Sequence, residues 1–407
     1  MPGYDAVDWF TDPALIEDPF PYFEHLRDTC PVTRLPHHDV IAVTGYDQAS
    51  ELWRRPEDFS SCNSVTGPFP GLPEAVEGDD ANEVIERNRA GLPMGEYLIT
   101  QDPPAHTALR GLLMRLLTPR RLQESEAAIG RLADRKLDAV LDRPSFDVQN
   151  EFAQPFALLV IAELLGVPED EHPAFTHHVG GLDPLAFLSD TFSAYVEDRR
   201  RVPRDDVLTS LATATYPDGT LPEVADVVRT ATFLFAAGQD TTARLITAAL
   251  RVLGDDAALQ DRLRREPQRI PDFLEEVLRL DGPVKTVSRV ARVTTTLDGV
   301  DIPAGTTIAV FPHAANRDPG RFEAPAELRL DRRNSREHLA FGRGIHACPG
   351  GPLARVEARI ALERLLARTS AIRISEAEHG PPGARRYRYE PTYILRGVKA
   401  LHLEVSR

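Results

Sequence analysis

The sequence predicts a mainly α-helical protein with a minor β-sheet region, and three stretches of the chain support this prediction. Residues 105–280 carry apolar side chains largely at helical spacing. Residues 285–311 are rich in β-branched residues and contain turn signals, which favours short strands. A last helix is expected at Leu353–Thr369, followed by strand signals at Tyr393–Leu395 and Ala400–Val405.

The elements before the β-branched region follow from local patterns. The expected helices are Pro21–Arg27, Asp47–Arg54, His106–Leu117, 121–142, 152–165, 191–201 and Pro222–Val252, with a short strand at Val40–Thr44. Pro222 suits the first turn of the longest helix, where its missing N–H costs nothing. Residues 60–100 have weak periodicity and many Pro, Gly and acidic residues, which predicts a long loop.

Composition excludes several classes of protein. Hydrophobic residues make up 42% and charged residues 27% of the 407 residues, which is typical of a globular chain. The net charge of −15 disfavours nucleic-acid binding. We expect no membrane association, because no apolar run reaches the roughly 18 to 20 residues of a membrane helix and no signal peptide begins the chain. Three cysteines make no disulfide framework, so a reducing cytoplasm is the expected location.

A cysteine within a glycine-rich turn is the clearest chemical feature. Cys348 lies in Phe-Gly-Arg-Gly-Ile-His-Ala-Cys-Pro-Gly-Gly-Pro-Leu-Ala-Arg, residues 341–355, directly before the last predicted helix. The positive end of a helix favours a thiolate, and glycines let a flat ligand approach the backbone. The same pattern would suit a buried structural cysteine, or a cysteine protease whose His and Asn lie elsewhere. A zinc site is disfavoured, because no second cysteine lies at ligand spacing.

This segment resembles the haem-binding loop of the cytochrome P450 family. The family pattern Phe-Gly-x-Gly-x-His-x-Cys-x-Gly-x-x-Leu-Ala-Arg is met at every fixed position. The resemblance implies the cytochrome P450 fold as a single domain over residues 1–407, haem b as the cofactor and Cys348 as the axial thiolate of its iron. It also implies a monooxygenase that inserts one oxygen atom of O2 into a hydrophobic small or medium-sized organic substrate, with hydroxylation as the expected reaction.

A second match lies in the long helix, at Ala236–Thr242. Gly238 costs about 1 kcal/mol relative to Ala in mid-helix, so a packing or functional reason is expected. The Thr241 hydroxyl is placed to bond the Ala237 carbonyl, which would widen the helix locally. An Asp–Thr pair is by itself commonly a surface feature. Here it resembles the acid–alcohol pair of the family, which implies that Asp240 and Thr241 relay protons during oxygen activation.

Four basic side chains match the positions that bind haem propionates in the family. His106 and Arg110 share a helix face at i, i+4 spacing. Arg289 opens the β-branched segment, and His346 precedes the cysteine by two residues. Each would otherwise be an ordinary solvated side chain. The resemblance implies that all four donate charge-assisted hydrogen bonds to the propionates.

A further pair is expected to be structural. Glu276 and Arg279 match the Glu-x-x-Arg motif of the family, and their i, i+3 spacing permits an ion pair. The resemblance implies a third partner, an arginine from the irregular segment before the cysteine loop. Arg332 and Arg333 are both candidates for that position.

The substrate pocket is expected to be apolar. By position in the family the residues facing the haem would be Phe233, Ala236, Ala237, Val287, Ile394 and Leu395. Apolar walls imply a hydrophobic substrate held mainly by shape. A Phe/Ala stripe at helical spacing could equally be core. The 60–100 loop is longer and the lid at 170–200 shorter than usual in the family, so we expect substrate access to be arranged differently.

The chain resembles the bacterial branch of the family, which takes electrons from NAD(P)H through ferredoxin reductase and ferredoxin. We expect a monomer, with Arg120, Arg121 and Arg343 as candidate contacts to an acidic partner. Two alternatives stay open at this point. One is a haem-thiolate catalyst that uses peroxide or rearranges its substrate, against which Asp240 and Thr241 argue. The other is a haem-containing sensor without turnover.

Overall fold

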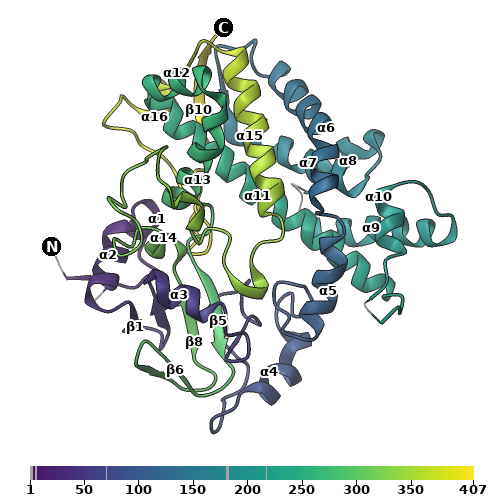
Figure 1. Cartoon of the computed structure of the whole chain (residues 1–407), viewed down its shortest axis with the longest axis vertical. Coiled ribbons are helices and arrows are strands. Elements are labelled where there is room, and N and C mark those ends of the chain that lie inside the picture. Colours follow the sequence, from purple (N-terminus) through teal and green to yellow (C-terminus); the bar gives the residue numbers. More distant parts are fainter. Residues whose placement is uncertain (1–2, 5–6, 70, 180–182, 217) are drawn as a thin grey trace. The chain divides into compact units, whose positions relative to one another are not determined.

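Figure 1 shows the computed structural model, which describes residues 3–4, 7–69, 71–179, 183–216 and 218–407. Residue 70 of the predicted loop and residues 180–182 of the lid therefore lie outside the described residues. The chain divides into two units. Unit 1 comprises Met1–His106, Glu275–Cys348 and Arg388–Gly397, and unit 2 comprises Thr107–Leu274, Pro349–Tyr387 and Val398–Arg407. The division falls within the helices α5 (Ala105–Met114) and α13 (Ile270–Asp281).

A five-stranded sheet organises unit 1. Its strand order is β1-β2-β8-β5-β3, in which β2 and β8 are parallel and the other neighbours antiparallel. The strands are β1 (Val32–Arg34), β2 (Ile41–Val43), β3 (Phe59–Ser60), β5 (Val287–Ala291) and β8 (Thr307–Val310). A separate hairpin pairs β6 (Thr295–Leu297) with β7 (Val300–Ile302). The β-branched region therefore forms strands as predicted.

The two faces of this sheet bury different helices. Ile41 and Val43 of β2 pack in one core cluster with α3 (Tyr46–Leu52). Ala42, which lies between them, packs in a second cluster with α1 (Ala14–Glu17), α2 (Phe20–Thr29) and α14 (Pro312–Ala315). Successive strand residues point to opposite faces, so a run of three apolar residues serves both clusters.

The segment 60–100 is not the structureless loop that its composition predicted. It contains α4 (Asn82–Asn88), followed by a 3-10 turn at Arg89–Gly91. The Asp80 carboxylate accepts a hydrogen bond of 2.7 Å from the Asn82 N–H, which satisfies one of the donors at the start of the helix. Within α4 only Ile85 is buried. The helix therefore lacks the apolar stripe by which a sequence pattern reveals one.

Unit 2 is mainly helical and is arranged around α11 (Val224–Asp255), which packs against α7, α9 and α15 (Figure 1). Its other helices are α6 (Pro119–Asp138), α7 (Gln154–Leu165), α8 (His172–Val179), α9 (Pro184–Arg201), α10 (Val207–Ala212), α12 (Ala257–Arg265), α15 (Gly351–Arg368) and α16 (Glu376–His379). The strands β4 (Ser145–Asp147), β10 (His402–Ser406) and β9 (Ala371–Ile374) form a sheet in that order. Nowhere in the described residues does a helix combine the length and apolarity that crossing a membrane requires.

Two predicted features are wrong in detail. Helix α11 begins at Val224, so Pro222 precedes the N-cap residue Glu223 and does not form the first turn. No strand forms at residues 393–395, where Leu395 makes only an isolated bridge to Val284. Residues 393–395, which were predicted to form a strand, therefore have mostly irregular backbone.

A buried ion cluster lies where α13 meets the segment before the cysteine loop. The side chains of Glu276 and Arg279 are 0% exposed and are joined at 2.7 Å. The Arg332 side chain is 4% exposed, and its Nε lies 3.0 Å from Glu276 Oε1. Arg332 rather than the exposed Arg333 therefore fills the position that the sequence left open. Burial alone would raise the pKa of Glu276, but hydrogen bonds, led by that from Arg279, hold this pKa below its usual value.

Both arginines of the cluster also bind backbone. Arg279 donates to the carbonyls of Asn316, Pro325 and Glu327 at 3.1, 2.6 and 2.8 Å. Arg332 donates to the carbonyl of Glu323 at 2.7 Å. The described segment between α14 and the cysteine loop contains no long helix or strand. The cluster therefore supplies partners that a regular hydrogen-bond ladder would otherwise provide.

The two neighbouring arginines allow a matched test of the cluster. We expect Arg332→Ala to lower the free energy of unfolding by about 3–5 kcal/mol, because it breaks a buried ion cluster. The control Arg333→Ala removes an exposed side chain and should change the free energy by about 0.5 kcal/mol or less. Denaturant unfolding followed by circular dichroism measures both. Equal losses in the two variants would contradict the structural role of Arg332.

Candidate functional site

Cys348 ends a tight glycine loop in unit 1. Its backbone N–H donates to the Phe341 carbonyl at 2.8 Å, which closes the loop, and its thiol is exposed. Gly342 and Gly344 have φ angles of 64° and 71°, in the left-handed region that favours glycine. A Cβ atom on Gly344 would lie 1.9 Å from the Trp53 carbonyl oxygen. The loop thus sits against the end of α3 at a distance that only glycine allows.

Two of the predicted propionate ligands lie together in unit 1. The rings of His106, near the start of α5, and His346, within the cysteine loop, have centroids 4.1 Å apart and are tilted by 47°. His346 and Cys348 belong to the same loop, so the predicted thiolate and both histidines come from neighbouring backbone. Arg110 follows His106 by one helical turn in α5, but belongs to unit 2.

Arg289 on β5 is a buried guanidinium group. It donates to the Ser64 hydroxyl at 2.8 Å and to the Ser288 carbonyl at 2.7 Å, and it makes no ion pair with any residue that the structure describes. Burial lowers the pKa of Arg289 to about 10, and the charge of Asp102 opposes this shift. A buried cation is costly unless an anion compensates it. Arg289 is therefore suited to receive a carboxylate.

A hydrogen-bond network around Asp102 holds the backbone before α5, and it was not predicted from the sequence. The Asp102 carboxylate accepts hydrogen bonds from the Ser60 hydroxyl at 2.5 Å, the Ser61 N–H at 3.0 Å and Arg89 Nη2 at 2.9 Å. Its backbone carbonyl accepts the His106 N–H at 3.0 Å. The available signal was Asp102 in the Asp-Pro-Pro that directly precedes the helix of His106. No motif or spacing in the sequence around Arg89 indicated its contact with Asp102.

The predicted acid–alcohol pair lies on α11, in unit 2. The Thr241 hydroxyl donates to the Ala237 carbonyl at 2.9 Å, as expected. Asp240 Oδ2 accepts a hydrogen bond of 2.8 Å from Arg244 Nε, one turn further along, a partner that was not singled out from the sequence. Helix α11 continues without interruption through these residues, so the expected local widening is not seen.

Gly238 has a packing reason. A Cβ atom there would lie 2.6 Å from the Cδ1 atom of Ile161, on α7. On the same helix Phe233 and Ala236 are half-buried and Ala237 is exposed. These three side chains are not among the fully buried residues of α11, and their place in a substrate pocket stays a prediction.

The other predicted pocket residues lie in unit 1. Val287 is two positions before Arg289 on β5, so the two side chains share a face of that strand. The carbonyl of Ile394 accepts the backbone N–H of Lys285 at 2.8 Å. Val287, Ile394 and Leu395 are all half-buried.

The candidate contacts to a redox partner differ in accessibility. The Arg120 side chain is 87% exposed and pairs with Glu124 at 2.7 Å. Arg343 instead donates to the Tyr46 hydroxyl at 2.8 Å, which ties it into unit 1. The Nη1 atom of Arg121 is buried. Of the three, only Arg120 offers a fully accessible guanidinium group.

The chemistry of these donors fits a haem. Cysteine thiolate is one of the protein ligands of haem iron. The propionates are carboxylates, to which Arg289 and the two histidines can donate charge-assisted hydrogen bonds. Gly342 leaves open space where a side chain would otherwise stand, since a Cβ atom there would meet nothing closer than 4.0 Å.

Known proteins are similar over nearly the full chain. Cytochrome P450 144 of Mycobacterium tuberculosis is 33% identical over 412 residues, which cover 96% of this chain and 90% of that protein. This chain belongs to the cytochrome P450 family. The family model described as Cytochrome P450 matches residues 185–377. The structure of substrate-free Mycobacterium marinum cytochrome P450 CYP150A6 is 57% identical, with a TM-score of 0.98 and 99% of each chain covered. The 6-deoxyerythronolide B hydroxylase of Saccharopolyspora erythraea is 33% identical over 90% of each chain.

Membership of the cytochrome P450 family establishes the coarse function. The protein is an oxidoreductase of the monooxygenase type, and the fold class predicted from the sequence is confirmed. The family uses haem iron, redox partners, O2 and hydrophobic substrates. The roles of individual residues in this chain stay predictions.

The contact between Gly344 and Trp53 predicts how the cytochrome P450 loop responds to one added methyl group. Gly344→Ala should lower haem content and destabilise the protein by several kcal/mol, because the Cβ atom overlaps a backbone oxygen. The control Gly299→Ala has φ 76° and open space, so it bears only the conformational cost of about 1–2 kcal/mol. Haem absorbance per protein and thermal unfolding measure the difference. A Gly344→Ala protein with full haem content would show that the loop moves to accommodate the added methyl group, which would contradict the prediction.

Proposed function

We propose that this cytochrome P450 hydroxylates a hydrophobic small or medium-sized organic compound. The observation that carries the proposal is the exposed thiol of Cys348 on its glycine loop, in the same unit as the buried Arg289, which makes no ion pair with a described residue. Haem b, when bound, supplies the activation of O2 and the oxidation of the substrate. Cys348 would ligate its iron, and His106, Arg110, Arg289 and His346 would hold its propionates.

Proton delivery is assigned to α11. The Thr241 hydroxyl donates its proton to Ala237, which leaves the lone pairs of Oγ1 to accept another hydrogen bond. Asp240 is 31% exposed, so it can exchange protons with solvent, and Arg244 engages its Oδ2 atom. We infer that Oδ1 of Asp240 carries protons from solvent toward Thr241. A positioned acid–base group of this kind contributes about 10²–10⁴-fold to a rate.

The proposed substrate class and partners rest on the apolar pocket residues, on the similarity to known proteins and on one exposed arginine. The six candidate pocket residues are apolar, which supports a hydrophobic substrate recognised mainly by shape. The similarity to a protein named as a hydroxylase supports hydroxylation as the reaction. Electrons would come from NAD(P)H through a ferredoxin reductase and a ferredoxin, with exposed Arg120 as a contact to the acidic ferredoxin. The protein would act as a monomer in the cytoplasm.

The thiolate assignment is tested by replacing the ligand. Cys348→His should still bind haem, but it should lose the red-shifted Soret band that a thiolate ligand gives to the ferrous carbonyl complex. Cys30→Ala is the matched control, because it removes another thiol without touching the loop, and it should keep the band. Absorbance difference spectra of the reduced proteins with carbon monoxide make the measurement. Persistence of the band in Cys348→His would refute the assignment.

The proton-delivery assignment is tested by the stoichiometry of turnover. Thr241→Ala should lower the fraction of consumed NAD(P)H that ends in product by about tenfold or more, with the balance released as peroxide. Thr241→Ser keeps the hydroxyl group and should restore coupling. The assay uses the compound that most shifts the Soret band in a screen of hydrophobic compounds, with a ferredoxin and its reductase. Unchanged coupling in Thr241→Ala would remove this residue from the mechanism.

A further inference from the structure

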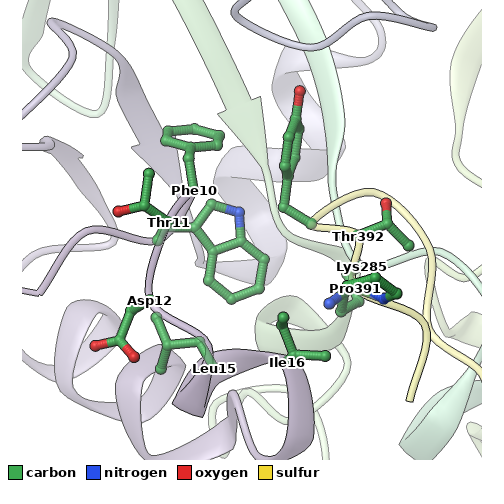
Figure 2. Close-up of a pocket in the computed structure, with 10 residues that line it drawn as sticks. Phe10, Thr11, Asp12, Leu15, Ile16, Lys285, Pro391 and Thr392 are labelled. Atoms are coloured by element: carbon green, nitrogen blue, oxygen red, sulfur yellow. The ribbon is translucent and has the colours of Figure 1, made fainter.

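Unit 1 contains a cavity of about 50 Å³, and none of the predicted haem or substrate residues lines it. It lies between the N-terminal segment at residues 9–16 and the segment at residues 391–393. Figure 2 shows Asp12, Leu15 and Ile16 on one side, and Lys285 with Pro391 on the other. The cavity is therefore bounded by two segments that are far apart in the sequence.

Two buried hydrogen-bond donors line this cavity. Lys285 is 1% exposed, and its ammonium group makes no hydrogen bond or ion pair with another described residue. Its Nζ atom lies 5.4 Å from the centroid of the Trp9 ring. The indole N–H of Trp9 is also buried and meets no acceptor in the part of the chain that the structure describes. The cavity thus holds two donors whose acceptor the described residues do not provide.

The contact with Trp9 does not offset the burial of Lys285. A cation–π interaction stabilises a cation less than its removal from water without a counter-ion destabilises it. Burial, with a smaller contribution from the nearby charge of Arg396, lowers the pKa of Lys285 to about 8. An anion in the cavity would remove most of this penalty.

Among the described residues, three charged or titratable groups near Lys285 have partners elsewhere. The Asp12 carboxylate accepts a backbone N–H of α1 at 2.9 Å and makes no ion pair with Lys285. Arg396 is paired with Asp281 at 2.6 Å. The Tyr393 hydroxyl donates to a backbone carbonyl at 2.9 Å, and burial raises its pKa. None of these groups makes an ion pair with the ammonium, so a bound anion would supply a counter-charge that the described residues do not provide.

We propose that this cavity binds a small monocarboxylate anion. Its carboxylate would lie between Lys285 Nζ and Trp9 Nε1, and its short alkyl group would pack against Leu15 and Ile16. The volume corresponds to about two water molecules of liquid at about 30 Å³ each, which suits an ion the size of acetate. One cation favours a single negative charge over a phosphate dianion, and Asp12 at the cavity disfavours additional negative charge.

The backbone around the cavity gives its occupation a structural consequence. The Lys285 N–H donates to the Ile394 carbonyl at 2.8 Å, and the Thr286 hydroxyl donates to the Tyr393 carbonyl at 2.9 Å. A carboxylate held by Lys285 and Trp9 would therefore connect the N-terminal segment with the segment at 391–394. The bound anion should raise the thermal stability of the protein.

Isothermal titration calorimetry of the haem-loaded protein with sodium acetate tests the proposal, with sodium chloride keeping the ionic strength constant. The wild type should bind one acetate saturably, and Lys285→Gln should lose the binding. The matched control Lys399→Gln changes another of the three lysines, an exposed one, and should bind as the wild type does. Trp9→Phe should weaken binding several-fold, because it removes the indole N–H and keeps an aromatic ring.

The pH dependence gives a second measurement that needs no variant. Acetate is ionised above about pH 5, so its affinity should be constant up to about pH 8, where free Lys285 loses its proton. Above that pH the affinity should fall about tenfold per pH unit. An affinity that stays constant from about pH 7 to about pH 10 would overturn the proposal even if Lys285→Gln fails to fold.

The remaining outcomes are also decisive. The proposal is overturned if the wild type gives no saturable heat, or if Lys285→Gln and Lys399→Gln bind acetate equally. The Soret band is recorded during each titration, and it should not move. A shift that follows the binding curve would place acetate at the haem iron instead and would equally overturn the proposal.

Discussion

The position of the cysteine loop depends on the ion pairs that the buried Glu276 carboxylate makes with Arg279 and Arg332. Between α14 and that loop, the only regular element of the described chain is one 3-10 turn at Ser335–Glu337, so much of its backbone must find partners in side chains. Glu276 holds Arg279 and Arg332, and these two guanidinium groups donate to carbonyls along the segment. The Glu276 carboxylate thereby orients both guanidinium groups, and these groups hold the irregular backbone of the segment in place. In such a network each member depends on the others.

A steric constraint then sets the loop itself. Gly344 lies against the carbonyl of Trp53, where no side chain fits. Two polar contacts hold α3 in that place, since the Tyr46 hydroxyl donates to the Glu337 carbonyl at 2.7 Å and accepts from Arg343 at 2.8 Å. The glycine of a sequence motif is thus a packing requirement imposed by a helix nearly 300 positions earlier in the chain. The cysteine is positioned by both constraints together.

What could be predicted from the sequence was mostly what short-range spacing determines. The fold class, the cysteine loop, the long helix and the bond from Thr241 to the carbonyl four residues back all follow from nearby residues. The choice of Arg332 over Arg333 could not be predicted, because it depends on the path of an irregular segment. Helix α4 was missed because it buries only Ile85. Arg244, the partner of Asp240, lies one turn away and could have been found from i, i+4 spacing alone.

Two of the buried cations of unit 1 show how one physical rule gives sites of different kinds. Arg289 and Lys285 are both buried without an ion pair among the described residues. A guanidinium group stays protonated across physiological pH even when its pKa falls to about 10, so it suits a carboxylate that is bound permanently. An amine whose pKa falls to about 8 gains and loses its charge near neutral pH, which suits an anion that exchanges with solvent. Family motifs identify the first kind of site, whereas the second is visible only when each buried charge is matched with its partner.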